Sequence, residues 1–144
     1  MYYIAHVSDI MSKNVITTTK DTPLLEVAKI FESYKFNGIP VLDEEKKLIG
    51  IVTQYDVITK MASLFTGKKE EADPKKLLKL TAADVMNAEA VTLPESATLE
   101  EALKSFSEHH RVSSIPVIDT SRRVVGVISR FDVLRSFNDF QTTS

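Results

Sequence analysis

Two pairs of a hydroxyl and a carboxylate residue are the part of this sequence best suited to binding chemistry. Thr53 stands three residues before Asp56, and Ser129 stands three residues before Asp132. At the start of a helix this spacing forms a capping box, in which each side chain accepts a backbone N–H. The same place suits a nucleotide, because a helix N-terminus attracts phosphate and a carboxylate can accept from two ribose hydroxyls. The two interpretations are compatible, and the sequence supports both.

Both pairs belong to an internal repeat. Residues 47–58 and 123–134 share a glycine, a hydroxyl and an aspartate at matched places, with a constant offset of 76 (126 − 50, 129 − 53 and 132 − 56). Upstream, residues 8–11 match 83–86 at an offset of 75 (84 − 9). The second copy therefore has one extra residue, most simply near His109–Arg111. A repeat that preserves polar residues as well as apolar ones indicates a duplicated site.

The elements that must position these pairs follow the same order in each copy. The first helix is predicted to begin at Thr22–Pro23, with Pro23 at the first helical position. Its counterpart is predicted to begin with a capping box at residues 98–101. The strands that follow are apolar and occupy residues 38–43, 48–52, 114–119 and 124–128. We therefore expect an α/β (α+β) fold of two β-α-β-β-α repeats, packed about a pseudo-two-fold axis into one module.

The boundaries follow from the repeat and from the charged stretch inside it. Residues 7–66 form the first repeat, 67–80 a charged linker, 81–137 the second repeat and 138–144 a short C-terminal tail. A single repeat is small for independent stability. We therefore expect the two to pack as one body.

Composition excludes several functional classes. The chain has 144 residues, with 18 Lys and Arg against 20 Asp and Glu. It therefore has no excess of positive charge that would attract nucleic acid. It contains no cysteine, which excludes disulfides and thiolate zinc sites. His6, His109 and His110 lack the spacing of a zinc-binding helix, so we expect no metal.

Other expectations concern catalysis and location. The sequence has neither a Gly-x-Ser-x-Gly elbow nor a Gly-x4-Gly-Lys phosphate loop, so we expect no enzyme activity. It shows no signal peptide at its start and no run of about 18 apolar residues. A cytoplasmic protein that does not enter a membrane is the expectation.

Taken together, these motifs resemble a tandem pair of cystathionine-β-synthase (CBS) domains, also called a Bateman module. Asp-hydrophobic-Met, Ile-Pro-Val-hydrophobic-Asp and Gly-x-x-[Ser/Thr]-x-x-Asp each occur twice, and the resemblance covers residues 7–137. Residues 110–117 are also similar to segments of the γ subunit of AMP-activated protein kinase. The resemblance implies a regulatory module that binds AMP, ADP or ATP and modulates a partner protein or its own assembly. The alternatives are a module for S-adenosylmethionine and a ligand-free interaction scaffold.

The resemblance also implies roles for individual residues. Asp56 and Asp132 would bind ribose. The phosphate contacts would be Thr53, Ser129, Arg130, His110 and Arg111. The adenine pockets would be formed by Ile16, Thr17, Gly38, Ile39 and Pro40 in one copy and by Val91, Thr92, Ser113, Ser114, Ile115 and Pro116 in the other.

The two sites differ in charge. Arg130 follows the second hydroxyl where Gln54 follows the first, and an arginine forks onto phosphate oxygens. We therefore expect adenosine phosphates to bind more tightly beside Ser129 and Asp132. No catalytic cofactor is expected.

Self-association is the last expectation. The family commonly pairs two modules into a disc through the helices that flank its sheets. Here residues 55–65 and 131–137 supply apolar side chains beyond what a small core needs. A homodimer is therefore predicted.

Overall fold

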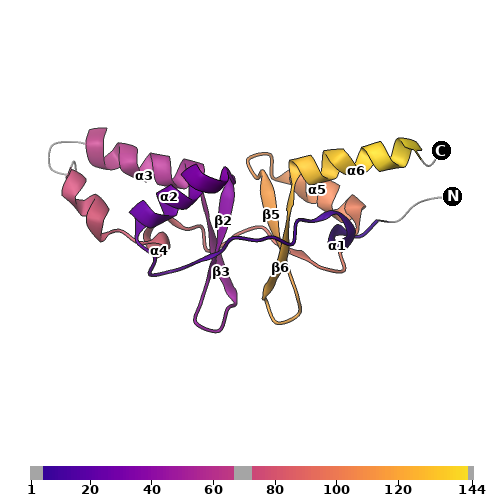
Figure 1. Ribbon diagram of the computed structural model, residues 1–144, viewed down its shortest axis with the longest axis horizontal. Coiled ribbons are helices and arrows are strands. Elements are labelled where there is room, and N and C mark those ends of the chain that lie inside the picture. The colour runs from indigo at the N-terminus through magenta and orange to yellow at the C-terminus, as the bar shows by residue number, and fades with distance from the viewer. Residues whose placement is uncertain (1–4, 67–72, 143–144) are drawn as a thin grey trace. The chain divides into compact units, whose positions relative to one another are not determined.

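The computed structural model describes residues 5–66 and 73–142 and contains two small sheets of the same topology (Figure 1). In each sheet the first two strands are parallel and the last two antiparallel. The strands are β1 (Thr18–Thr19), β2 (Gly38–Leu42), β3 (Leu48–Thr53), β4 (Leu93–Pro94), β5 (Ser114–Ile118) and β6 (Val124–Ser129). The predicted mixed α/β fold is confirmed.

A helix connects the parallel strands of each sheet, and a second helix follows each third strand. The helices are α1 (Val7–Ile10), α2 (Leu24–Tyr34), α3 (Gln54–Thr66), the 3-10 helix η1 (Pro74–Lys79), α4 (Ala82–Val85), α5 (Leu99–Glu108) and α6 (Arg130–Thr142). Sequence reasoning did not predict α1, α4 or η1. It also placed Pro23 one position too far into α2, because Pro23 is the N-cap and Leu24 the first helical residue.

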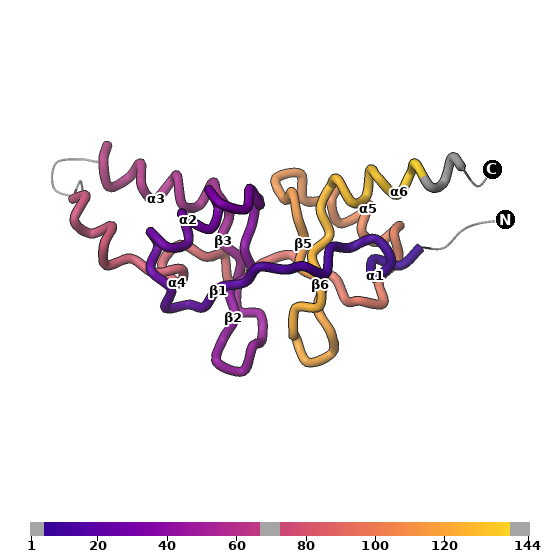
Figure 2. The backbone as a smooth tube through the Cα atoms, in the orientation of Figure 1, coloured from indigo at the N-terminus to yellow at the C-terminus, as the bar shows by residue number. Residues whose placement is uncertain are grey.

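The structure groups the chain into two units that differ from two contiguous repeats. The central unit consists of residues 16–90, and the C-terminal unit combines residues 5–15 with 91–142. In the C-terminal unit, Ser12 and Val127 exchange two backbone hydrogen bonds of 2.9 Å, so the N-terminal segment runs beside β6 (Figure 2). Asn87 and Ile51 do the same in the central unit, at 2.8 and 3.1 Å. Each sheet is therefore extended by a segment that precedes the other copy in sequence.

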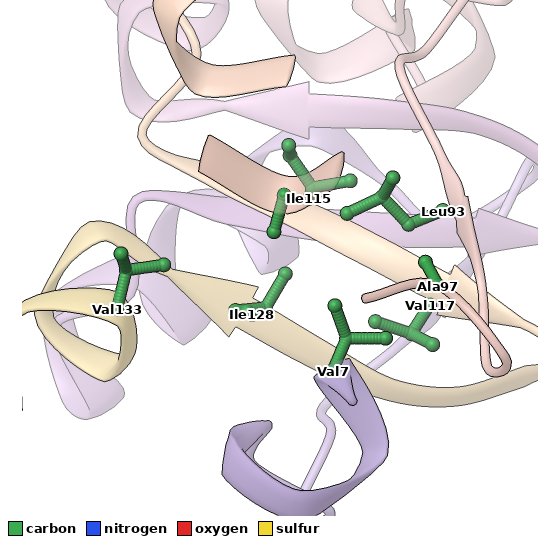
Figure 3. Close-up of a cluster of buried hydrophobic side chains, with 8 residues drawn as sticks. Val7, Leu93, Ala97, Ile115, Val117, Ile128 and Val133 are labelled. Carbon is green, nitrogen blue, oxygen red and sulfur yellow. The ribbon is translucent and has the colours of Figure 1, made fainter. Parts of the chain in front are cut away.

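We call residues 5–15 and 82–90 the exchanged segments, because each packs with the sheet of the other copy. Each unit has its own apolar core, and each core includes a residue from one exchanged segment. Val7 is completely buried among strand residues such as Ile115, Val117 and Ile128 of the C-terminal unit (Figure 3). Ala82 is likewise buried in the core of the central unit. Because burial of apolar surface is the main force that holds a domain together, the exchanged segments contribute directly to the stability of each unit.

Glycine and methionine make the closest packing in both units. A β-carbon built on Gly50 would lie 2.8 Å from Met86 Sδ, and one on Gly126 would lie 2.8 Å from Met11 Cγ. Only glycine leaves room for the methionine of the exchanged segment. This contact gives a physical reason for the repeated glycine and the repeated Asp-hydrophobic-Met motif together.

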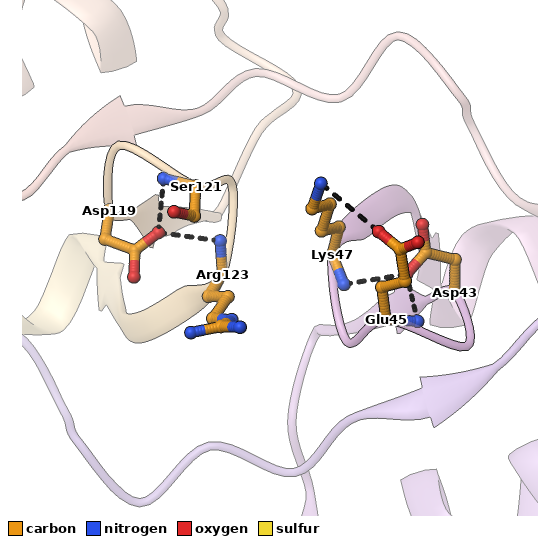
Figure 4. A network of polar contacts seen from close by, with 6 residues as sticks. All are labelled: Asp43, Glu45, Lys47, Asp119, Ser121 and Arg123. Carbon is orange, nitrogen blue, oxygen red and sulfur yellow. Dashed lines mark hydrogen bonds and ion pairs between the residues drawn. The ribbon is translucent and has the colours of Figure 1, made fainter.

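The hairpin turns explain the repeated aspartate that follows the Ile-Pro-Val strand. Asp43 Oδ1 accepts hydrogen bonds from the backbone N–H groups of Glu45 and Lys47, at 2.8 and 2.9 Å. Asp119 makes the same two bonds in the second copy, to residues 121 and 123 (Figure 4). Aspartate thus closes each turn by a side-chain bond to the backbone.

The connection into the second strand differs between the copies. It runs over residues 35–37 between α2 and β2, and over residues 109–113 between α5 and β5. Since α2 has 11 residues and α5 has 10, the second copy gains one residue overall. The extra residue predicted near His109–Arg111 is therefore confirmed.

Candidate functional site

The hydroxyl and carboxylate of each pair cap a helix, as one of the two interpretations predicted. The Thr53 N–H donates to Asp56 Oδ2 at 2.9 Å, and the Asp56 N–H donates to Thr53 Oγ1 at 3.1 Å. Ser129 and Asp132 make the same reciprocal bonds at 2.8 and 3.1 Å. The two side chains of each pair are thereby held next to each other at the start of α3 and α6.

Capping leaves part of each pair available for a ligand. The hydroxyl of Thr53 or Ser129 accepts a bond in the cap, so its hydrogen can still donate. The cap uses only Oδ2 of each aspartate. Among the described residues, Asp56 Oδ1 has no hydrogen-bond partner, whereas Asp132 Oδ1 accepts from Arg135 and forms an ion pair with it. Each site therefore combines one hydroxyl donor with a carboxylate, and a carboxylate is the acceptor that a pair of ribose hydroxyls requires.

The backbone at the helix start has fewer free donors than the sequence suggested. The Arg130 N–H donates to the Ser113 carbonyl at 3.1 Å, and the Gln54 N–H donates to the Asn37 carbonyl at 3.2 Å. Around the start of α6 the amides of residues 129, 130 and 132 are thus all engaged. This geometry suits recognition of hydroxyl groups better than recognition of phosphate.

The side chain after each hydroxyl binds backbone carbonyls of the same unit. Arg130 Nε donates to the Val112 carbonyl at 3.1 Å, and its Nη2 donates to the His110 carbonyl. In the central unit, Gln54 Nε2 donates to the Phe36 carbonyl at 2.6 Å. Two of the five N–H donors of Arg130, a predicted phosphate contact, therefore bind the connection between α5 and β5.

The predicted adenine residues divide by burial. Antiparallel pairing sets Gly38 directly opposite Thr53, and Ser114 directly opposite Ser129. The half-buried members are Ile16, Thr17, Gly38, Val91, Thr92, Ser113 and Ser114. The completely buried members are Ile39, Pro40, Ile115 and Pro116. Contact with a ligand is thus simplest at the half-buried positions.

All residues predicted for one site fall in one unit. Those beside Thr53 and Asp56 belong to the central unit, and those beside Ser129 and Asp132 to the C-terminal unit. His110 and Arg111 are exposed, in the connection that Arg130 binds.

An open pocket of about 260 Å³ lies on the central unit. Its lining consists of Tyr55, Asp56, Thr59, Lys60, Ser63, Asp84 and Val85. Of the predicted site residues, only Asp56 contributes to it. Within residues 5–66 and 73–142, no group of three His, Asp or Glu side chains could hold a metal ion. None of the helices in these ranges is long and apolar enough to cross a membrane.

Two residues of the site were missed by sequence reasoning. Arg135 lies three positions after Asp132 on the same helix, a spacing that brings opposite charges together. Gln54 matches Arg130 at the repeat offset (130 − 54 = 76), so the alignment alone could have suggested a shared role.

Comparison with known proteins gives a consistent result. The sequence model of the CBS domain matches residues 7–63 and 82–139. Two curated relatives from Methanocaldococcus jannaschii are an L-aspartate semialdehyde sulfurtransferase, 31% identical over 93% of this chain, and an inosine-5'-monophosphate dehydrogenase, 33% identical over 88%. The aligned part is only 23% and 22% of their respective lengths.

A solved structure matches nearly the whole chain. The CBS domain pair of protein MJ0100, in complex with 5'-methylthioadenosine and S-adenosyl-L-methionine, is 30% identical. The match covers 96% of this chain and 99% of that chain, with a TM-score of 0.78.

Proposed function

Because the chain belongs to the CBS domain family, with two copies of the domain, we propose that it is a regulatory module that binds ligands carrying an adenosine group. The observation that supports this most directly is the duplicated cap. In both units the cap leaves a hydroxyl hydrogen and a carboxylate next to each other at a helix start. Asp56 and Asp132 would accept hydrogen bonds from the ribose hydroxyls, and Thr53 and Ser129 would donate to the 5' substituent.

The adenine ring would lie against the half-buried residues next to each cap. Gly38 and Ser114 are nearest by strand pairing, because each stands opposite the capping hydroxyl. The absence of a side chain at Gly38 leaves room for close approach of a flat ring.

Two ligand classes share this adenosine chemistry and differ at the 5' position. The exposed, basic His110 and Arg111 favour the phosphates of AMP, ADP or ATP. The 30% identical MJ0100 pair, which binds 5'-methylthioadenosine and S-adenosyl-L-methionine, favours a 5'-sulfur ligand. Arg130 keeps its positive charge at the second site, but two of its five donors bind backbone carbonyls, which leaves fewer for a phosphate.

Isothermal titration with AMP, ATP, 5'-methylthioadenosine and S-adenosylmethionine tests the proposal. Loss of a hydrogen bond to a charged group costs about 1.5–3 kcal/mol, so Asp132→Ala should weaken binding about tenfold to a hundredfold. Asp56→Ala should do the same at the other site. A ligand series that favours one 5' group identifies the class.

The control must account for the cap, because these substitutions also remove a helix-capping bond. Asp9 caps α1 in the same unit as Asp132, by accepting from the His6 N–H at 3.0 Å, and it is outside the proposed site. Asp9→Ala should leave affinity unchanged. If folded wild-type protein binds none of the four ligands, the scaffold alternative replaces this proposal.

The regulated activity would lie outside these 144 residues. The curated enzymes that match the chain are more than four times the length of the aligned part. Ligand binding would act on such a partner through a difference in affinity between two states of the module.

We also propose that the module forms a homodimer through α3 and α6. Each helix exposes an apolar stripe, with Tyr55, Ile58 and Phe65 on α3 and Phe131, Leu134 and Phe137 on α6. Two of the three residues in each stripe occupy matched positions of the two copies, as 131 − 55 and 134 − 58 both equal 76. A second copy of the chain, with the same two stripes, is the occupant that these surfaces fit.

A further inference from the structure

Arg130 and Gln54 make the same kind of contact although their side chains differ. Each binds the carbonyl of the residue 18 positions earlier, Val112 for Arg130 and Phe36 for Gln54. Both carbonyls lie in the connection between a helix and the second strand of the sheet. Because the contact recurs in both copies although the residue type changes, we infer that it has the same structural role in each.

The difference in residue type follows the length of that connection. The shorter connection, residues 35–37, is bound by Gln54 through a single amide donor. The longer connection, residues 109–113, is bound by Arg130 at two carbonyls, those of Val112 and His110. A guanidinium has five N–H donors in a rigid fork, so it can hold two points of a longer loop at once.

A backbone bond stands beside each side-chain contact. The Arg130 N–H donates to the Ser113 carbonyl, and the Gln54 N–H donates to the Asn37 carbonyl. The residue that follows each connection, Ser114 of β5 or Gly38 of β2, stands opposite the capping hydroxyl. The contacts therefore join the two segments from which each site is built.

We propose that Arg130 and Gln54 are positioning residues, which hold the connection before β5 or β2 against the start of α6 or α3. This inference rests on the proposed adenosine sites. It gives Arg130 a role besides the predicted phosphate contact, because its Nε and Nη2 donate to backbone carbonyls of its own unit. In this arrangement the site binds the adenosine group, and Arg130 holds the connection before β5 in place beside the start of α6.

The test compares a ligand that has a phosphate with one that lacks it. AMP and 5'-methylthioadenosine are titrated into wild type, Arg130→Ala and Arg130→Gln, and each protein is first shown to be folded by circular dichroism. Removal of a positioning bond should weaken both ligands by the same factor, about fivefold. Arg130→Gln should restore both affinities, since glutamine makes this contact at the matched place of the central unit. Arg123→Ala, at an exposed arginine of the turn between β5 and β6 that is outside the proposed site, is the control for loss of charge.

Amide hydrogen exchange without ligand tests the contact separately from binding. The Arg130 N–H donates to Ser113, and the Val112 N–H donates to the His109 carbonyl at 2.9 Å. Arg130→Ala should accelerate exchange at both amides, and Arg130→Gln should slow it again.

The outcomes separate the two proposals. Loss of AMP affinity alone in Arg130→Ala makes the arginine a phosphate ligand and overturns the positioning role. Unchanged exchange at residues 112 and 130 also overturns it. If wild type binds neither ligand, the proposed adenosine function fails and the positioning role at a ligand site fails with it. Faster exchange in Arg130→Ala would then still establish the contact itself.

Discussion

At the scale of single residues, the third strand of each sheet has a glycine where a methionine from a distant segment packs against the backbone. A strand glycine normally weakens a sheet, because it loses more backbone entropy on folding than alanine does. Alanine at Gly126 would nevertheless meet Met11 Sδ, Cγ and Cε, all within 3.0 Å of its β-carbon. Packing, and not backbone freedom, therefore decides which residue this position accepts.

We expect Gly126→Ala to lower the free energy of unfolding by about 1–3 kcal/mol, the usual cost of an overpacked core. Chemical denaturation measures the change. The atoms that block the β-carbon all belong to one flexible side chain, so shortening it by Met11→Ala should remove the clash. The double variant should thus be more stable than the sum of the two single effects predicts, by about 0.5–3 kcal/mol.

Gly50 provides the matched comparison in the central unit. Its β-carbon would meet Met86 Sδ at 2.8 Å and also the Asn87 carbonyl oxygen at 3.0 Å. Because a backbone oxygen cannot be trimmed by mutation, Met86→Ala should rescue Gly50→Ala less completely. Strictly additive effects at Gly126 and Met11 would contradict this account of the motif.

At the scale of elements, the two hairpins contain one unfavourable backbone position each. Lys46 has φ 65° and Arg122 has φ 63°, both in the left-handed region. A residue with a β-carbon loses about 1–2 kcal/mol there. The aspartate bonds that close each turn compensate for this strain (Figure 4).

Lys46→Gly should therefore be more stable than Lys46→Ala, by about 1 kcal/mol. Both variants remove the same charge, so their difference in denaturation midpoint isolates the backbone effect. Equal stability of the two variants would show that the turn does not strain residue 46.

The sequence predicted the positions of the helices and strands well, but not which segments pack together in one unit. Alternating apolar strands, amphipathic helices and the capping pairs follow from local patterns, and β2, β3, β5 and β6 lie where expected. The exchange of segments 5–15 and 82–90 between the copies could not be predicted. Residues 8–11 and 83–86 match each other, so the pattern is the same whichever sheet each segment joins.

The candidate site was predictable to the same extent. Thr53, Asp56 and their counterparts were found because type and spacing define a cap. The engagement of Arg130 by the Val112 carbonyl was not foreseen, because it depends on a contact between residues 18 positions apart. Residue type alone suggested phosphate binding, because a guanidinium forks onto phosphate oxygens.

At the scale of the whole molecule, the exposed stripes of α3 and α6 predict the assembly. Ile58 is 63% exposed and Leu134 is 64% exposed, and a charge at either would oppose burial against a second copy. We expect the variant with both Ile58→Glu and Leu134→Glu to have the monomer mass in sedimentation equilibrium, and wild type the dimer mass.

Leu78→Glu is the control for that experiment. Leu78 is 73% exposed on η1 and is outside both stripes, so its substitution should preserve the dimer. A wild-type monomer, or a dimer that survives both glutamates, would contradict the proposed interface.

The grouping of residues 5–15 with 91–142 has a consequence for how the chain is made. The central unit is continuous in sequence, so it can fold as soon as residue 90 has left the ribosome. Val7 and Met11 are translated before the central unit, yet their sheet is completed only after β6 is made, which takes several seconds at about 5–20 residues per second. During that interval the apolar side chains of residues 5–15 have been made but lack their partners in residues 91–142. Apolar surface exposed in this way is what chaperones bind on nascent chains.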